Sequence, residues 1–253
     1  MVTEPLPFEV NAFGGVTILP AALELPDMAF NEALRHNLDA WAAQGYKLAW
    51  LKIGLERAAL IPLAAEQGFA FHHSDETSLM MTRRLQPQAF VPAYATHYVG
   101  AGGVALNERQ ELLVVCELHR RGNRPYYKLP GGALQAGEHL ADAVVREVLE
   151  ETGVSTRFVS LACLRHWHGY RDGKSDIYFV CRLEPLSQAI QRQVEEIEEC
   201  LWMPLADYMA SDLVSAFNKQ IVQAAVGTPG LAIAEITGYG PRERYEFFMP
   251  HDD

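Results

Sequence analysis

Apolar residues in the first third of the chain follow two patterns. Short apolar runs predict strands, and longer stretches in which apolar side chains recur every three or four residues predict helices. We expect the first helix to start with Asp27 as its N-cap and the second to be kinked or split by Pro62. Residues 1–12, which contain several prolines, are predicted to be irregular. The pattern predicts a small βαβαββ unit, with strands at 15–19, 47–53, 69–73 and 78–84 and helices at 27–44 and 55–67.

Two proline pairs, Gln86-Pro87 and Val91-Pro92, then predict a linker, because proline favours extended backbone before it and ends regular structure. We therefore divide the chain into an N-terminal α/β domain of unknown role, residues 1–90, and a second domain, residues 93–253, which ends in a helix and a tail. The second domain has the pattern of a mixed sheet with an amphipathic helix packed on it. Strands are predicted at 94–106, 111–117, 126–129, 157–167, 175–183 and 199–202, and helices within 132–154 and at 204–209 and 213–225.

Composition narrows the function classes. The chain has 253 residues, of which 49% are hydrophobic and 21% charged, as in a globular protein. Its net charge of -11 argues against nucleic acid as a partner but allows a small phosphorylated substrate, because a bound cation reverses the local field. No apolar run approaches the roughly 20 residues of a membrane span, so we expect no membrane association. The four cysteines form no CxxC pair, which predicts free thiols and a cytoplasmic location.

The stretch from Gly132 to Val154 carries the candidate chemistry. Its helix places three carboxylates on one face, at positions i, i+3 and i+4: Glu147, Glu150 and Glu151. Such an acidic face is usually solvated. Beside an apolar loop, however, the mutual repulsion of the carboxylates favours neutralisation by a divalent cation, and ligands that are all oxygen favour Mg²⁺ or Mn²⁺ over Zn²⁺.

The spacing in this stretch resembles the Nudix box. Gly132 is followed after five residues by Glu138 and, after seven more, by Arg146-Glu147-Val148-x-Glu150-Glu151-x-Gly153-Val154. The resemblance implies a Nudix α/β/α sandwich with a mixed sheet. It also implies divalent-metal-dependent hydrolysis of a nucleoside diphosphate linked to another moiety.

Residues outside the box resemble one two-domain Nudix family. Trp50, Gly68-Phe69, His72-His73 and the stretch 164–185 are similar to a family that includes the human protein encoded antisense to basic fibroblast growth factor and plant ADP-ribose and NADH pyrophosphatases. In that family the smaller N-terminal α/β domain is similar to part of an acetyltransferase-like fold. The resemblance therefore favours ADP-ribose or NADH as substrate.

The resemblance also implies roles for individual residues. Arg146 would pair with a carboxylate and orient it, although a plain surface cation is the alternative. Glu196 is the candidate for the base or additional ligand outside the box; the alternative is an exposed acidic turn. Glu150 is expected to take part in catalysis as well as in metal binding. The metal ligands would be the Gly132 carbonyl and the carboxylates of Glu147, Glu150 and Glu151.

Candidates for substrate contacts lie in two further segments. Arg165, His166 and His168 form a cationic and imidazole set suited to phosphate. Tyr127, just before the glycine loop, would stack on a base. In each case the alternative is an ordinary packed or solvated side chain. Tyr170 lies at an offset from the box associated with dinucleoside polyphosphate hydrolases.

Three functions follow. The first is a pyrophosphatase acting on a small nucleotide, ADP-ribose or NADH. The second is a dinucleoside polyphosphate or CoA pyrophosphatase, and the third is a non-catalytic Nudix module that binds a nucleotide or a protein. We expect the N-terminal domain to pack on the Nudix domain or to mediate homodimerisation. The tail from Gly227 covers an edge strand or reaches a partner, and the sequence does not decide between them.

Overall fold

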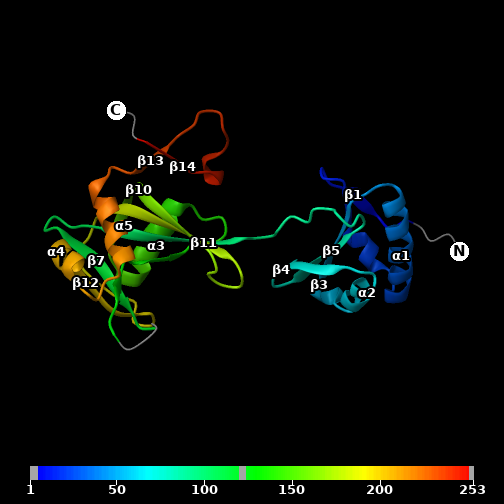
Figure 1. The fold of residues 1–253 in the computed structure, drawn as a ribbon, viewed down its shortest axis with the longest axis horizontal. Coiled ribbons are helices and arrows are strands. Elements are labelled where there is room, and N and C mark those ends of the chain that lie inside the picture. The colour runs from blue at the N-terminus through cyan, green and yellow to red at the C-terminus, as the bar shows by residue number, and fades with distance from the viewer. Residues whose placement is uncertain (1–4, 120–123, 251–253) are drawn as a thin grey trace. The chain divides into compact units, whose positions relative to one another are not determined.

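The computed structural model describes residues 5–119 and 124–250 and is shown in Figure 1. The chain divides into two compact units, residues 1–95 and 96–253. The division falls a few residues after the predicted linker. Each unit has its own buried apolar core.

The first unit is a five-stranded sheet in the order β1-β2-β3-β5-β4, with two helices. Strands β2 and β3 are parallel and joined through α1, whereas the other pairs are antiparallel. Trp41 and Phe30 of α1 are fully buried against the sheet. The elements are β1 (Phe8–Val10), β2 (Gly15–Ile18), the 3-10 helix η1 (Pro20–Glu24), α1 (Asp27–Ala43), β3 (Leu48–Gly54), η2 (Leu55–Arg57), α2 (Leu60–Glu66), β4 (Ala70–Ser74) and β5 (Ser78–Arg84).

Two local predictions for this unit are corrected, and a third is confirmed. Residues 8–10 form β1, because Phe8 packs at 5.3 Å from the Trp41 ring and the strand pairs with β2, a long-range contact that local sequence does not show. Asp27 is the first helical residue, and Pro26 occupies the N-cap position. Of the two alternatives for the second helix, the split is confirmed: η2 and α2 are separate, and Pro62 is the third residue of α2, where its missing N–H costs no helical hydrogen bond.

The second unit contains two sheets. A six-stranded sheet has the order β14-β13-β10-β11-β6-β9, and a three-stranded sheet has the order β12-β7-β8. Only β11 and β6 pair in parallel, so the larger sheet is mixed. The elements are β6 (His97–Ala105), β7 (Glu111–Glu117), β8 (Tyr127–Lys128), β9 (Gly131–Ala133), α3 (Leu140–Thr152), β10 (Thr156–Trp167), β11 (Ser175–Pro185), β12 (Ile197–Pro204), α4 (Leu205–Ala210), α5 (Ala216–Gly227), β13 (Leu231–Ala234), η3 (Arg242–Arg244) and β14 (Phe247–Pro250).

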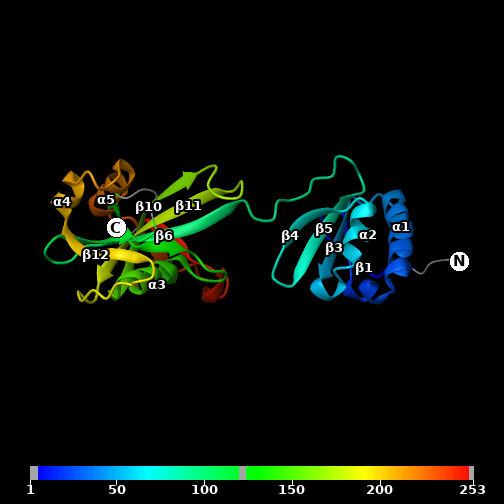
Figure 2. The ribbon, with the colours of Figure 1, turned by 90° about the horizontal axis from the view of Figure 1, so that it is seen from below.

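Helices cover both faces of the β-sheet layer, as Figure 2 shows. Val144 and Val148 of α3 are buried in one apolar cluster with Leu183 of β11. Tyr208 of α4 and Val222 of α5 are buried in a second cluster on the other face. This arrangement confirms the predicted α/β/α sandwich with a mixed sheet.

The tail forms a hairpin that extends the sheet. β13 pairs with the edge strand β10, with Leu231 opposite Leu161, and β14 pairs with β13. Phe248 of β14 lies 5.7 Å from the ring of Phe158. Of the two alternatives left by the sequence, the structure shows the tail covering an edge strand.

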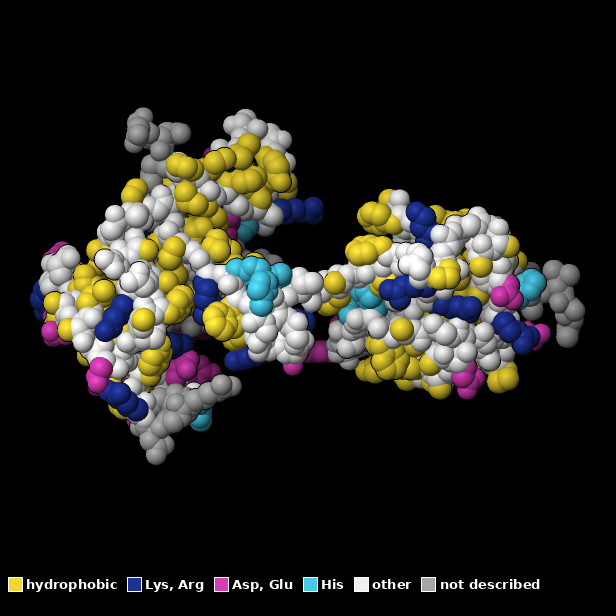
Figure 3. Space-filling model, in the orientation of Figure 1, with side chains coloured by type: hydrophobic (Ala, Val, Ile, Leu, Met, Phe, Trp, Pro, Cys, Tyr) yellow, Lys and Arg dark blue, Asp and Glu magenta, His cyan; other side chains and the backbone are white. Residues whose placement is uncertain are grey.

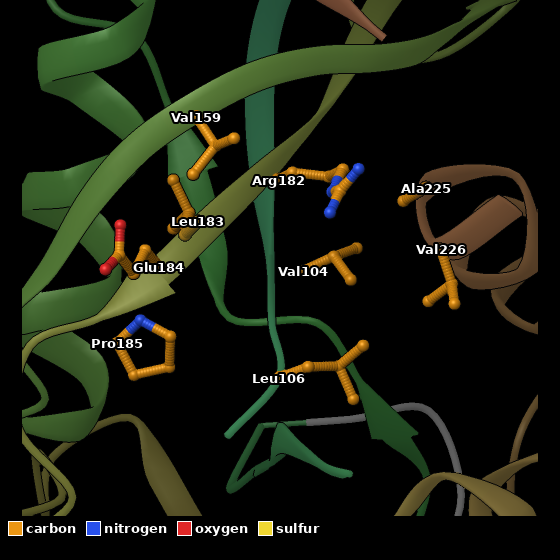
Figure 4. A pocket seen from close by; sticks show the side chains of 9 residues that line it. All are labelled: Val104, Leu106, Val159, Arg182, Leu183, Glu184, Pro185, Ala225 and Val226. Atoms are coloured by element: carbon orange, nitrogen blue, oxygen red, sulfur yellow. The ribbon is translucent and has the colours of Figure 1, made fainter. Parts of the chain in front are cut away.

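A small cavity of about 290 Å³ lies between α5 and the sheet (Figure 4). Its walls are mostly apolar and include Val104 and Val226. The one arginine in its lining, Arg182, donates a hydrogen bond to the Thr228 carbonyl at 3.1 Å. Neither the glycine loop nor the acidic residues of α3 line this cavity, so it is not the candidate active site.

Gly153 ends α3 in the left-handed region, with φ of +72°. A Cβ there would lie 2.7 Å from Gln191 Cβ and 2.9 Å from its backbone nitrogen. We expect Gly153→Ala to lower the free energy of unfolding by about 1–3 kcal/mol. Urea denaturation measures this change. Gly227→Ala is the matched control, since nothing lies within 4 Å of its Cβ, and an equal loss in both variants would contradict the prediction.

Candidate active site

Two glycines let β9 approach both the sheet and α3. Gly131 has φ of +148°, and a Cβ on it would lie 2.2 Å from the Ala101 carbonyl oxygen of β6. A Cβ on Gly132 would lie 2.4 Å from a carboxylate oxygen of Glu147. A side chain at Gly131 would therefore clash with the backbone of β6, and one at Gly132 would displace the Glu147 carboxylate.

Arg146 joins the loop to the acidic face of α3. Its Nε and Nη2 donate to the two carboxylate oxygens of Glu138 at 2.7 and 2.9 Å. Its Nη1 donates to Glu147 at 2.9 Å and to Glu150 at 3.0 Å. The guanidinium beside Glu138 lowers the pKa of that carboxyl, and the same pair raises the pKa of Arg146. The arginine thus contacts three carboxylates, as expected of a group that orients them.

Glu151 is the buried member of the acidic set, with 6% of its surface exposed. Its Oε2 accepts a hydrogen bond from the Gly131 amide at 2.9 Å. Burial raises the pKa of this carboxyl to about 7, and nearby Lys128 and the Gly131 amide oppose the shift. Without a cation, Glu151 therefore titrates near neutral pH.

A cleft of about 500 Å³ opens beside the glycine loop. Lys128 and Glu117 form an ion pair of 2.5 Å in its wall. Aromatic rings and further cations complete the lining. Among the lining residues are Tyr98, Glu117, Tyr126, Lys128, Gly131, Gly132, Arg165, Tyr170, Arg171, Asp176, Tyr178, Phe217 and Asn218.

Arg165 is held rigidly in this cleft. Its Nη2 is paired with Asp176, which is 6% exposed. Its guanidinium carbon lies 5.5 Å from the centre of the Tyr178 ring and 5.1 Å from that of Phe217. An arginine fixed by an ion pair and two rings presents its remaining donors to the cleft at little entropic cost.

The two histidines predicted beside Arg165 do not line the cleft. His166 Nε2 lies 2.8 Å from His97 Nε2, and its ring centre lies 4.4 Å from that of His168. Successive residues of a strand point to opposite faces, so Arg165 and His166 diverge. Figure 3 shows histidine side chains gathered on the surface of this unit. The predicted substrate contact of His166 and His168 finds no support in this placement.

Two other predicted residues also lie outside the cleft lining. The Tyr127 hydroxyl donates to Glu199 at 2.5 Å, which raises the pKa of Tyr127 to about 12, whereas its neighbour Tyr126 lines the cleft. Glu196 is exposed, and its carbonyl oxygen accepts from the Leu118 amide at 2.7 Å. Neither residue lines the cleft.

Sequence reasoning missed Glu117, Lys128 and Phe217. Glu117 and Lys128 lie on paired strands, with Val115 opposite Lys128. The register of this strand pair would have predicted that the two side chains are close. Phe217 comes from α5, and no motif links it to the box.

The predicted cation ligands are the carboxylates of Glu147, Glu150 and Glu151 and the carbonyl of Gly132. These oxygen atoms suit a hard cation. Among the described residues, no three His, Cys, Asp or Glu side chains already surround a common metal position. Arg146 occupies oxygens of Glu147 and Glu150, so cation binding would reorient these carboxylates. The residues fit a divalent cation by the chemistry of their oxygen atoms, and binding would require them to rearrange.

The raised pKa of Glu151 predicts a pH-dependent stability. Since the folded state holds this proton up to about pH 7 and a free glutamate releases it near 4.5, stability falls as pH rises between these values. In chelator, Glu151→Gln should therefore gain stability over wild type from pH 5 to pH 8, on the order of 1–3 kcal/mol. Urea unfolding at several pH values measures this. Glu150→Gln, whose carboxylate is 53% exposed, is the control; a gain independent of pH would contradict the shift.

The chain is similar in sequence to known proteins over most of its length. The Nudix hydrolase domain profile matches residues 6–85, and the NUDIX domain profile matches residues 96–225. Nudix hydrolase 8 of Arabidopsis thaliana is 37% identical over 81% of this chain, which spans 56% of that protein. Human nucleoside diphosphate-linked moiety X motif 6 is 34% identical over 85% of this chain and 70% of its own length. A NUDIX hydrolase structure from Nitrosomonas europaea is 25% identical, with a TM-score of 0.45, over 51% of this chain and 88% of that one.

No helix in residues 5–119 or 124–250 is long and apolar enough to cross a membrane.

Both units of the chain match Nudix profiles, and plant and human relatives align with most of it. The resemblance of the box and of its flanking residues is thereby confirmed, and the chain belongs to the Nudix family of pyrophosphohydrolases.

Proposed function

We propose that this protein hydrolyses the pyrophosphate bond of a nucleoside diphosphate linked to another moiety, with ADP-ribose or NADH as the favoured substrate. The observation that carries the proposal is the buried Glu151 carboxylate bonded to the glycine loop, at the edge of a cleft lined by cations and aromatic rings. Lys128 and Arg165 suit the phosphates, and Tyr126 and Phe217 suit a base.

We propose that Glu147, Glu150, Glu151 and the Gly132 carbonyl hold Mg²⁺ or Mn²⁺. When bound, the cation neutralises charge on the phosphate oxygens and lowers the pKa of a water. The chain's own residues then have separate tasks. Arg146 orients the carboxylates, and Glu151 must release the proton on its carboxyl before it can ligate.

The acid outside the box has two candidates. Glu117 lines the cleft next to Lys128, whereas Glu196, the candidate from sequence, lies on the surface outside the lining. We therefore propose Glu117 as a second candidate, in addition to Glu196, for the base or additional ligand. Activity of Glu117→Gln and Glu196→Gln, with exposed Glu195→Gln as control, separates the two candidates.

A dinucleoside polyphosphate is the second candidate substrate. Its support is Tyr170, which lines the cleft, with its ring centre 5.7 Å from that of Tyr98. The pair of Tyr98 and Tyr170 and the separate ring of Phe217 would suit a substrate with two bases.

We propose a cytoplasmic location, supported by four cysteines that are all free thiols.

We also propose that the chain forms a homodimer through its N-terminal unit, because this unit exposes the aromatic side chains of Phe13 and Phe90. Sedimentation of the full chain and of Phe13→Ser tests the dimer.

The full chain, incubated with Mg²⁺ or Mn²⁺ and with ADP-ribose, NADH, CoA or diadenosine polyphosphates, should release AMP from ADP-ribose or NADH at the highest kcat/KM. Glu151→Gln should lower kcat by at least about a hundredfold, because it removes a proposed ligand of the cation. Chromatography of the products measures both. No turnover of any compound would contradict an enzymatic function and favour a module that only binds.

Arg165→Ala should raise KM for the nucleotide by about tenfold or more, because it removes the fixed cation of the cleft. Arg165→Lys should recover only part of the loss, since lysine keeps the charge but not the planar fork. Because Asp176 loses its partner, melting temperatures must be recorded alongside the kinetics. Arg182→Ala, outside the cleft, is the control. An unchanged KM in a folded Arg165→Ala protein would exclude Arg165 from substrate binding.

A further inference from the structure

Helix α3 has no side-chain cap of its own. His139 occupies the N-cap position with extended backbone, φ of -73° and ψ of 147°, and its side chain makes no capping hydrogen bond. The first amides of any helix lack an intrahelical acceptor, and Ser, Thr, Asp or Asn usually supplies one. In the helix that carries the proposed cation ligands, this local solution is missing.

Glu246, more than a hundred residues away in the sequence, supplies the missing acceptors. Its Oε2 accepts from the Leu140 amide at 2.5 Å, and its Oε1 accepts from the Ala141 amide at 3.2 Å. His139 Nδ1 lies 3.7 Å from the same carboxylate, of which 13% is exposed. A largely buried negative charge at a helix N-terminus also interacts favourably with the helix dipole.

The tail hairpin holds this carboxylate in place. Glu246 lies between η3 and β14, and β13 joins the hairpin to β10. Phe248, two residues after Glu246, packs against the cluster that contains Val144 and Val148 of α3. The N-terminus of α3 is therefore tied to the sheet edge through the tail, and its last turns are tied to the glycine loop through Glu151.

We propose that Glu246 is a positioning residue for the cation site, an inference that rests on the proposed metal-dependent function. Glu147 and Glu151 lie about two and three turns beyond the capped amides. Loss of the cap would let the first turn of α3 fray, and the carboxylates that the helix carries would then be held less firmly relative to Gly132. Mg²⁺ demands near-ideal octahedral geometry, and ligands held loosely by even about 0.5 Å bind it poorly.

The test compares the full-length wild-type chain with Glu246→Ala, Glu246→Gln and the control Glu243→Gln, an exposed acid of the same tail. Mn²⁺ binding without nucleotide is measured from the electron paramagnetic resonance signal of the free ion. Glu246→Ala should weaken Mn²⁺ binding by about threefold to tenfold. Glu246→Gln, which keeps an acceptor, should lose less, and KM for the nucleotide at saturating Mn²⁺ should stay unchanged.

Hydrogen exchange of the α3 amides gives a readout that does not depend on metal, and faster exchange at Leu140–Val144 in Glu246→Ala is expected. If Glu246→Ala does not fold, Glu246→Gln decides by the same titration. Equal Mn²⁺ binding by wild type and a folded Glu246 variant would overturn this inference. A wild-type chain that binds no Mn²⁺ would instead overturn the proposed function.

Discussion

The Glu151 carboxylate lies beneath the glycine loop and accepts a hydrogen bond from the Gly131 amide. Several features follow from this one contact. The loop can come so close only because residues 131 and 132 lack side chains, and the carboxyl stays buried with a pKa near 7. The proton that burial retains is the one that a cation would displace. One hydrogen bond thus links the geometry of the loop to the position of the helix, at the site where we propose that a cation binds.

The charge of the whole chain says little about this site. The protein carries a net charge of -11, yet Lys128, Arg165 and Arg171 all line one cleft. Arg146 meanwhile holds the acidic helix face together from the other side of the loop. An anionic substrate would meet a local field set by these cations, because screening limits the influence of charges more than about 10 Å away.

The elements predicted from the sequence agree with the structure where they depend on residues that are close together in the chain. The box helix, its end at Gly153 and the alternation of strands and helices follow from residues close in the sequence. The misplaced features depend on long-range contacts. β1 needs β2 and Trp41, Phe217 reaches the cleft from α5, and Glu246 caps a helix a hundred residues earlier. His166 was grouped with Arg165 by adjacency, although strand alternation alone would have separated them.

The proposed cation ligands and the side chains that line the cleft come from different elements. This explains why the Nudix box does not identify the substrate. The proposed cation ligands come from α3 and from the loop that it touches, whereas the rings that line the cleft include Tyr126 just before β8, Tyr178 of β11 and Phe217 of α5. The buried residues of α5, such as Val222, belong to a different apolar cluster from those of α3, so changes on α5 are expected to leave the contact between Glu151 and Gly131 in place. Substrate preference is therefore expected to follow α5 and the segments at Tyr126 and Tyr170, while α3 would determine which bond is cleaved if the proposed function is correct.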